Sequence, residues 1–174
     1  MIKIYDDLIY SEALVEMHFR LMHEQVYRYD NTTNVPFGTE LDHRFFGMNW
    51  YPNDMPKWVD ELFTTLSNKI TFLQDEYYDL QVVSLNLQVQ GQDGDFHQDN
   101  YGDGNWYTLM VFPLVIWKTE WGGEFIYGDQ EIDYVPGRVI FFDGSVLHRG
   151  LSPKIPHVPR ITLVYRLKNL EKTI

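Results

Sequence analysis

Short, turn-separated strand patterns fill the second half of the chain and restrict its fold more than any other feature. Residues 83–90 alternate between apolar and polar side chains, and further strand patterns cover 106–114, 121–127, 132–135, 138–143, 147–152 and 160–167. Gly and Pro turns separate them, as at Pro136-Gly137. Roughly seven or eight short strands at this spacing predict an antiparallel β-sandwich or barrel.

The first half of the chain predicts two helices that support this β-rich core. One runs from a cap at Ser11 to about residue 29, and the other follows Asp54, its cap candidate, with Pro56 in the first turn. We expect the first helix to bury a broad apolar face made of Leu14, Val15, Met17, Phe19, Leu21, Met22 and Val26. The stripe expected for the second is Trp58, Val59, Leu62, Phe63, Leu66 and Ile70. Residues 1–174 form one predicted domain, with a helical support region at 1–80 and a β core at 81–168 that holds the site.

Composition excludes several classes of function. The 174 residues include 25 acidic and 14 basic side chains, for a formal net charge of −11, which argues against nucleic acid as a partner. No cysteine is present, so disulfides, thiolate metal sites and thiol nucleophiles are excluded. No apolar run approaches the ~20 residues of a membrane span, and the N-terminus lacks the apolar segment of a signal peptide. We expect a soluble, cytoplasmic domain with no membrane partner.

The alternating strand at 83–90 has a polar face that needs an explanation. If Leu85, Leu87 and Val89 pack under the helices, then Asn86, Gln88 and Gln90 point into the barrel. Buried amides require hydrogen-bond partners, which a wet cavity with a metal and a polar co-substrate would supply. An edge strand that faces solvent would satisfy them as well, and both interpretations stay open.

Two histidines and one aspartate suggest a metal site. His97 and Asp99 share a face of an extended segment, and His148 follows a strongly strand-like run. Two histidines and a carboxylate on one side of an ion form the facial triad of non-haem Fe(II) oxygenases. A surface His–Asp hydrogen bond is the simpler alternative. A catalytic His–Asp pair lacks a nucleophile, because the chain has no Gly-x-Ser-x-Gly sequence and no cysteine.

Together, several motifs from residue 82 to residue 167 resemble one family. His97-x-Asp99, Trp121-Gly122-Gly123-Glu124, Pro136-x-Arg138-x-Ile140-x-Phe142, His148 and Arg160-x-Thr162 are similar, in this order, to motifs of the Fe(II)/2-oxoglutarate-dependent dioxygenases, in particular their prolyl-4-hydroxylase-like branch. The resemblance implies a double-stranded β-helix (a jelly-roll, cupin-like barrel) supported by the two helices.

The same resemblance implies the chemistry. His97, Asp99 and His148 would hold Fe(II), and 2-oxoglutarate would bind the metal and pair its distal carboxylate with Arg160, helped by Thr162. With O2, the enzyme would release succinate and CO2 and hydroxylate a C–H bond of a peptidyl (prolyl-like) or free amino-acid side chain. Ascorbate would keep the iron reduced.

Some positions depart from the family pattern. The tyrosine that many relatives place before His-x-Asp is not evident, and Gln88, Asn86 or Tyr107 are the candidates to replace it. Arg166 has the parity of Arg160 and is an alternative ligand for the co-substrate or for an acidic group of the substrate. His157, in the long segment between His148 and Arg160, is a rival metal ligand.

The substrate and the partners are less constrained. The residues that we expect around the mouth of the site are Tyr101, Trp106, Trp121 and Arg149, with a structural role in the core as the alternative for each. A metalloenzyme that works without 2-oxoglutarate, and a non-catalytic barrel that binds a small metabolite or carbohydrate, are the competing functions. The sequence does not indicate an oligomeric state.

Overall fold

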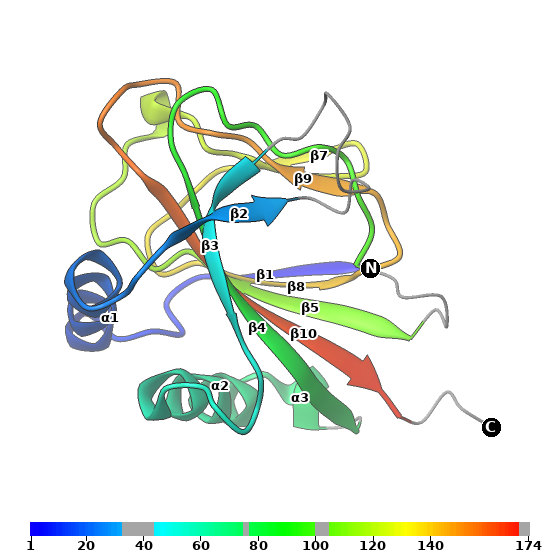
Figure 1. Cartoon of the computed structure of the whole chain (residues 1–174). Coiled ribbons are helices and arrows are strands. Elements are labelled where there is room, and N and C mark those ends of the chain that lie inside the picture. The colour runs from blue at the N-terminus through cyan, green and yellow to red at the C-terminus, as the bar shows by residue number, and fades with distance from the viewer. Residues whose placement is uncertain (33–43, 75–76, 100–104, 171–174) are drawn as a thin grey trace.

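The computed structural model describes residues 1–32, 44–74, 77–99 and 105–170, and these form two antiparallel sheets with helices against the larger one (Figure 1). The larger sheet has seven strands in the order β1 (Ile2–Tyr5), β8 (Val139–Asp143), β5 (Trp106–Val111), β10 (Arg160–Asn169), β4 (Tyr78–Gln88), β3 (Arg44–Trp50) and β2 (Arg28–Thr32). The smaller sheet has the order β7 (Gln130–Ile132), β6 (Phe125–Tyr127) and β9 (His148–Gly150). The helices are α1 (Ser11–His23), α2 (Lys57–Lys69) and the short α3 (Thr71–Gln74), with a 3-10 turn at Thr119–Trp121.

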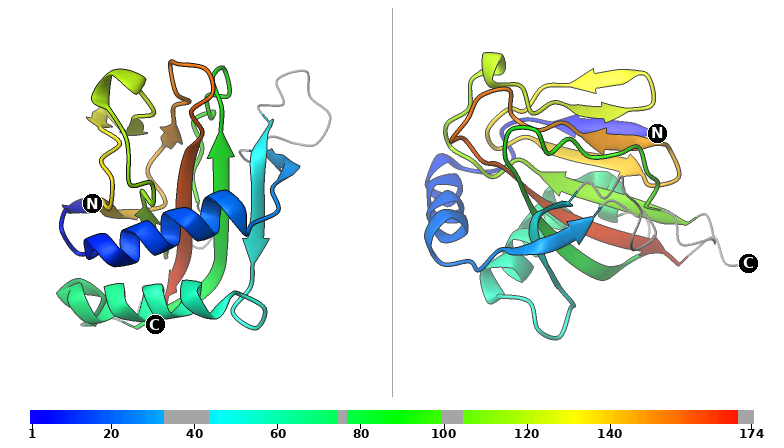
Figure 2. Two further views of the ribbon diagram at one scale, coloured as in Figure 1. Left: turned by 90° about the vertical axis from the view of Figure 1, so that its left-hand side faces the viewer. Right: turned by 45° about the horizontal axis from the view of Figure 1, so that its top comes forward.

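Side-chain parity on the central strands separates a core face from a cavity face. The odd-numbered residues Leu85 on β4 and Leu163 and Tyr165 on β10 are fully buried on the side of the helices. Figure 2 shows α1 and α2 lying across this face of the sheet, where Met17, Leu21, Val59 and Leu66 complete the apolar cluster. The Tyr165 hydroxyl donates a hydrogen bond to the Val59 carbonyl at 3.0 Å and ties β10 to α2. The even-numbered residues of both strands therefore face the smaller sheet.

Helix α1 is shorter and narrower in its contacts than its sequence pattern predicts. It ends at His23, and residues 28–32 pair with β3 instead of continuing the helix. Only Met17 and Leu21 are buried, whereas Val15, Phe19, Met22 and Val26 are exposed, because the helix contacts the sheet along one narrow stripe. The predicted broad apolar face was wrong in this respect.

Neither predicted helix cap forms. The first helix starts after Tyr10, and the Ser11 hydroxyl donates to its neighbour Glu12. Asp54 accepts a hydrogen bond from the Tyr51 backbone N–H at 2.6 Å, so it closes the preceding turn, and α2 begins after Pro56.

Residues 1–80 contribute strands as well as helices. Three strands, β1, β2 and β3, come from this region, and β1 and β2 form the two edges of the seven-stranded sheet. The fold is thus mainly β with two longer helices, arranged as a sandwich. No helix in the described ranges is long and apolar enough to cross a membrane.

We predict that Leu85→Ala lowers the free energy of unfolding by about 2–5 kcal/mol, because the truncated side chain leaves a cavity under the helices. Val89→Ala is the matched control, since Val89 has the same parity but lies beyond β4 and is 36% exposed; its effect should stay within about 0.5 kcal/mol. Urea unfolding measures both. Equal losses in the two variants would contradict the assigned core face.

Candidate metal centre

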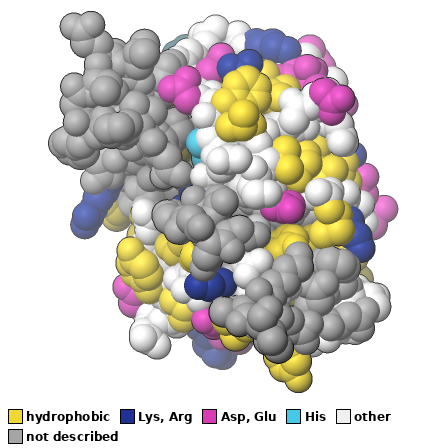
Figure 3. Space-filling view, turned by 90° about the vertical axis from the view of Figure 1, so that its right-hand side faces the viewer, with side chains coloured by type: hydrophobic (Ala, Val, Ile, Leu, Met, Phe, Trp, Pro, Cys, Tyr) yellow, Lys and Arg dark blue, Asp and Glu magenta, His cyan; other side chains and the backbone are white. Residues whose placement is uncertain are grey.

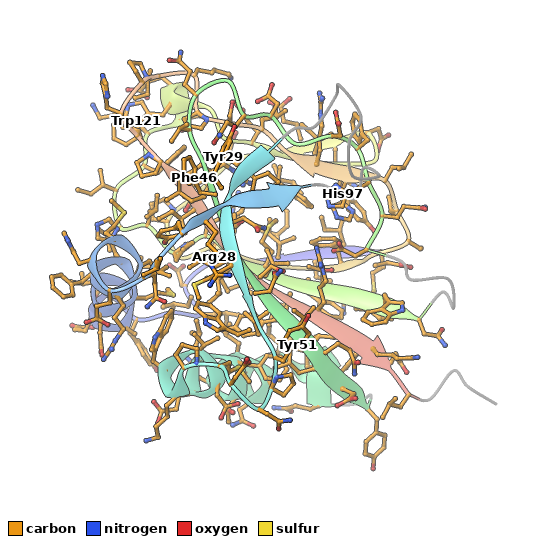
Figure 4. All side chains as sticks on the ribbon, viewed as in Figure 1. Arg28, Tyr29, Phe46, Tyr51, His97 and Trp121 are labelled. Carbon is orange, nitrogen blue, oxygen red and sulfur yellow. The ribbon has the colours of Figure 1, made fainter. Side chains whose placement is uncertain are left out.

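Three potential metal ligands meet between the two sheets. One ligand atom each from His97, Asp99 and His148 lies within 4.8 Å of the other two. A local pairing brings the segments together, because the backbone N–H groups of His97 and His148 each donate to the other's carbonyl at 3.0 Å. His97 lies in the extended segment that the sequence predicts, outside the named strands, and forms an isolated bridge to β9. Figure 4 shows His97 on the right, between the level of β9 and that of β1 and β8.

Hydrogen bonds orient both imidazoles toward a shared ligand. Nδ1 of His97 lies 2.9 Å from the Asp95 carbonyl, and Nδ1 of His148 lies 2.8 Å from the Val146 carbonyl. A carbonyl only accepts, so each Nδ1 carries a proton and Nε2 is the ring nitrogen that can bind an ion. The two Nε2 atoms lie 3.9 and 3.5 Å from the Asp99 carboxylate, which places three donors on one side of a common point.

Asp99 is a buried carboxylate with one oxygen in a hydrogen bond and the other in an ion pair. Thr108 donates its hydroxyl to Oδ2 at 2.6 Å, and Nε of Arg166 lies 3.2 Å from Oδ1. The chain also approaches closely here, because a Cβ atom on Gly144 would lie 2.9 Å from the Cβ of Asp99. Only glycine fits at position 144 without a shift of Asp99.

Electrostatics keep the ligands in their metal-binding states. Burial alone raises the pKa of Asp99, but the charge of Arg166 is the largest of the effects that oppose burial, and together these effects hold that pKa well below its usual range. Burial, followed by the proximity of His148, lowers the pKa of His97. Near neutral pH the group is therefore one carboxylate and an imidazole with a free lone pair on Nε2.

The triad opens into a cavity of about 260 Å³ that both sheets line. Asn86 and Gln88 line it, as the cavity interpretation of the alternating strand predicts. Gln90 does not, because β4 ends at Gln88 and the exposed Gln90 amide donates to the Lys154 carbonyl. Thr162 and Arg160 lie on the cavity wall, together with Phe125, Phe142 and Met110. Figure 3 faces the side of the molecule on which His97 lies, and a small area of histidine surface is visible there.

Arg160 is almost fully buried, and one of its guanidinium nitrogens makes no hydrogen bond. Its Nε donates to the Gly123 carbonyl and its Nη1 to Gln88 Oε1, both at 2.8 Å, whereas Nη2 makes no hydrogen bond. Burial lowers its pKa to about 10, so the guanidinium remains charged at neutral pH. A Cβ atom on Gly150 would lie 2.9 Å from Nη1, so the guanidinium occupies the space that this glycine leaves.

Both polar atoms of the Gln88 amide are hydrogen-bonded, and one of them accepts from Arg160. Its Oε1 accepts from Arg160, and its Nε2 donates to the carbonyls of Gln92 at 2.7 Å and Gly150 at 3.2 Å. Gln88 therefore fixes the guanidinium, which differs from the direct contact with a co-substrate that the sequence suggested.

Several other predicted residues lie away from the cavity. Tyr107 is on the opposite face of β5, stacked on Phe141 with ring centroids 5.5 Å apart, so parity rules out its expected role beside the co-substrate. Trp106 lies beside Lys168, Arg149 stacks on Phe96, Trp121 packs on Trp117, and His157 is exposed outside the triad. Tyr101 falls outside the described residues.

Sequence reasoning missed three residues that shape the site. Thr108, Gly144 and Gly150 position Asp99 and Arg160. Thr108 had a usable signal, because it is the polar residue in an otherwise apolar strand. Nothing in the sequence around the two glycines indicates that Asp99 packs against Gly144 or that Arg160 packs against Gly150.

Comparison with solved structures establishes the fold. A viral collagen prolyl hydroxylase from Paramecium bursaria Chlorella virus-1, solved as a 2-oxoglutarate complex, has a TM-score of 0.68 and 15% identity over 96% of each chain. A Trichoplax adhaerens prolyl hydroxylase bound to a hypoxia-inducible-factor peptide has a TM-score of 0.68 and 13% identity, over 97% of this chain and 83% of that one.

The same fold carries another reaction among the similar structures. The α-ketoglutarate-dependent epimerase SnoN of nogalamycin biosynthesis has a TM-score of 0.70 and 12% identity, over 96% of this chain and 78% of that one. The sequence matches no protein-family model, and no curated protein resembles it closely enough in sequence to count as a relative. The fold is therefore that of prolyl hydroxylases and other 2-oxoglutarate oxygenases.

We predict that His148→Ala lowers the affinity for Mn(II), a redox-stable substitute for Fe(II), at least about 100-fold, because one of three ligands is lost. His157→Ala is the control and should leave the affinity unchanged, since His157 lies outside the triad. Isothermal titration calorimetry measures both. Mn(II) binding that survives in His148→Ala would exclude the triad as the metal site.

Proposed function

We propose that the protein is an Fe(II)- and 2-oxoglutarate-dependent dioxygenase that hydroxylates a C–H bond of an amino-acid side chain, free or peptidyl. One observation carries the proposal. A single cavity holds both a His-Asp-His triad and a buried arginine with a hydrogen-bonding nitrogen that has no partner. We also propose that the two sheets close as a double-stranded β-helix in one domain.

The triad residues fit a divalent iron. Two imidazoles and one carboxylate match the ligand preference of Fe(II), and donors on one side of the ion leave positions toward the cavity. Their Nδ1 hydrogen bonds fix the ring orientation before metal arrives, as outer-shell partners do in metal sites. When bound, Fe(II) with O2 supplies the oxidising chemistry that converts 2-oxoglutarate to succinate and CO2 and hydroxylates the substrate; ascorbate would keep it reduced.

Arg160 fits the distal carboxylate of 2-oxoglutarate. Its free Nη2 is a buried donor that needs an acceptor, and a buried cation gains most from a carboxylate partner. Thr162, two residues along the same face of β10, would add its hydroxyl to that carboxylate. Gln88 and the Gly123 carbonyl hold the guanidinium in place, so the pocket needs little rearrangement on binding.

The apolar part of the cavity wall would exclude water from the reacting centre. Phe125 and Phe142 pack against the His148 ring, with centroids 5.6 and 4.8 Å away, and Met110 lies on the same wall. A shielded site strengthens the electrostatic interactions of the ligands and limits side reactions.

We predict that Mn(II) together with 2-oxoglutarate raises the melting temperature of the protein further than Mn(II) alone. Ligands that bind only the native state stabilise it, by about 2.7 kcal/mol at a concentration of 100 Kd. Differential scanning fluorimetry measures the shift, with succinate as a weaker-binding comparison. If 2-oxoglutarate adds nothing to the shift with Mn(II), the proposed co-substrate is wrong.

We predict that Gly150→Ala weakens 2-oxoglutarate binding at least about tenfold, which corresponds to about 1.4 kcal/mol, because the added methyl displaces the Arg160 guanidinium. Arg160→Ala should have a larger effect. The affinity for Mn(II) should be unchanged in both variants, which shows that they fold. Arg138→Ala is the control, because Arg138 pairs with Asp6 outside the cavity. Unaltered 2-oxoglutarate affinity in Arg160→Ala would remove this arginine from the site.

A further inference from the structure

The cavity carries a second arginine. Arg160 and Arg166 lie on the same face of β10, six residues apart, which corresponds to roughly 20 Å along a strand. Both line the cavity. Arg160 lies against Gln88 and Gly150, whereas Arg166 lies beside Asp99, with Nε 3.2 Å from Oδ1. The two guanidinium groups therefore belong to different parts of one cavity.

The cavity that Arg166 lines also has polar side chains from β3 and β4. Asn49 on β3 and Ser84 and Asn86 on β4 line the cavity, and the Ser84 hydroxyl donates to Asn49 Oδ1 at 2.7 Å. The strand register shifts next to Arg166, which pairs with Val82 while Leu167 pairs with Leu80. Such bulges redirect side chains and are frequent beside active sites.

The charges in the cavity favour an anionic substrate. Among its described lining residues, Asp99 is the only acidic side chain, against the two arginines. A divalent iron and a 2-oxoglutarate dianion cancel each other, so the described lining residues would keep one net positive charge in the loaded cavity. A free acid with a net charge of −1 would neutralise it, whereas an uncharged internal residue of a peptide would not.

We propose that Arg166, with Asn49 and Ser84, binds a carboxylate of the substrate, and that the substrate is a small free acid with a net negative charge. This rests on the proposed function. The planar guanidinium suits bidentate binding of a carboxylate, and its five N–H donors allow contact with Asp99 and with a substrate together. Arg166 is thus assigned a part in specificity in addition to its contact with Asp99.

Matched pairs of acids and amides test this assignment. The full chain, loaded with Mn(II) and 2-oxoglutarate without oxygen, is titrated with the free L-amino acids and with short aliphatic carboxylic acids, and with the primary amide of each. Binding is followed by the melting temperature and by calorimetry. We expect at least one acid to bind at least about tenfold more tightly than its amide. If no acid binds more tightly than its amide, the inference is wrong.

Variants separate substrate binding from support of Asp99. Arg166→Gln should lower the affinity for the preferred acid at least about tenfold and abolish its advantage over the amide, with Mn(II) still bound. Arg138→Gln is the control, because Arg138 pairs with Asp6 outside the cavity. Asn49→Leu changes the same cavity wall at a residue that does not contact Asp99, and it should also lower the affinity for the preferred acid. Loss of Mn(II) binding in Arg166→Gln, with acid binding intact in Asn49→Leu, would make Arg166 a positioning residue only and overturn the assignment.

The wild-type protein distinguishes the two levels of the proposal. If it fails to bind Mn(II) and 2-oxoglutarate, the dioxygenase function itself fails. If it binds both and shows no preference for any acid over its amide, the function stands and only the substrate class is wrong.

Discussion

The buried carboxylate of Asp99 is the constraint on which the site depends. A carboxylate removed from water must be compensated, and here the Thr108 hydroxyl and the Arg166 guanidinium each contact one oxygen. Thr108 and Arg166 are partners across β5 and β10, so the order of the central strands places both beside Asp99. The close approach at Gly144 completes the arrangement, and the two histidines then converge on the same carboxylate.

Much of the site follows from order and parity in the sequence. His97, Asp99, His148 and Arg160 come together as their spacing suggests, and Asn86 and Gln88 face the cavity because they alternate with core residues. The same rule identifies the misplaced residue, since Tyr107 belongs to the core face while Thr108 faces the site. Strand parity was therefore a better guide than the chemical type of the side chain.

Other features depend on tertiary contacts that local patterns do not encode. The helical periodicity continues past His23, but pairing with β3 satisfies the backbone of residues 28–32 and the helix stops. The role of Gly150 depends on the Arg160 side chain, which reaches it from another strand. The same guanidinium donates a hydrogen bond to Gln88. The fold leaves the substrate open, because similar structures include prolyl hydroxylases and an epimerase. The charge of the cavity is more informative about the substrate than the fold is.

The central claim is that the triad and Arg160 hold Fe(II) and 2-oxoglutarate together in one cavity. Anaerobic optical spectroscopy tests it most directly, because a 2-oxo acid chelated to Fe(II) gives a visible charge-transfer absorption that neither component gives alone. We predict a band that appears only when Fe(II) and 2-oxoglutarate are both added, and that is absent when succinate replaces 2-oxoglutarate and in His148→Ala. Wild-type protein that binds Fe(II) and develops no such band at saturating 2-oxoglutarate would contradict it.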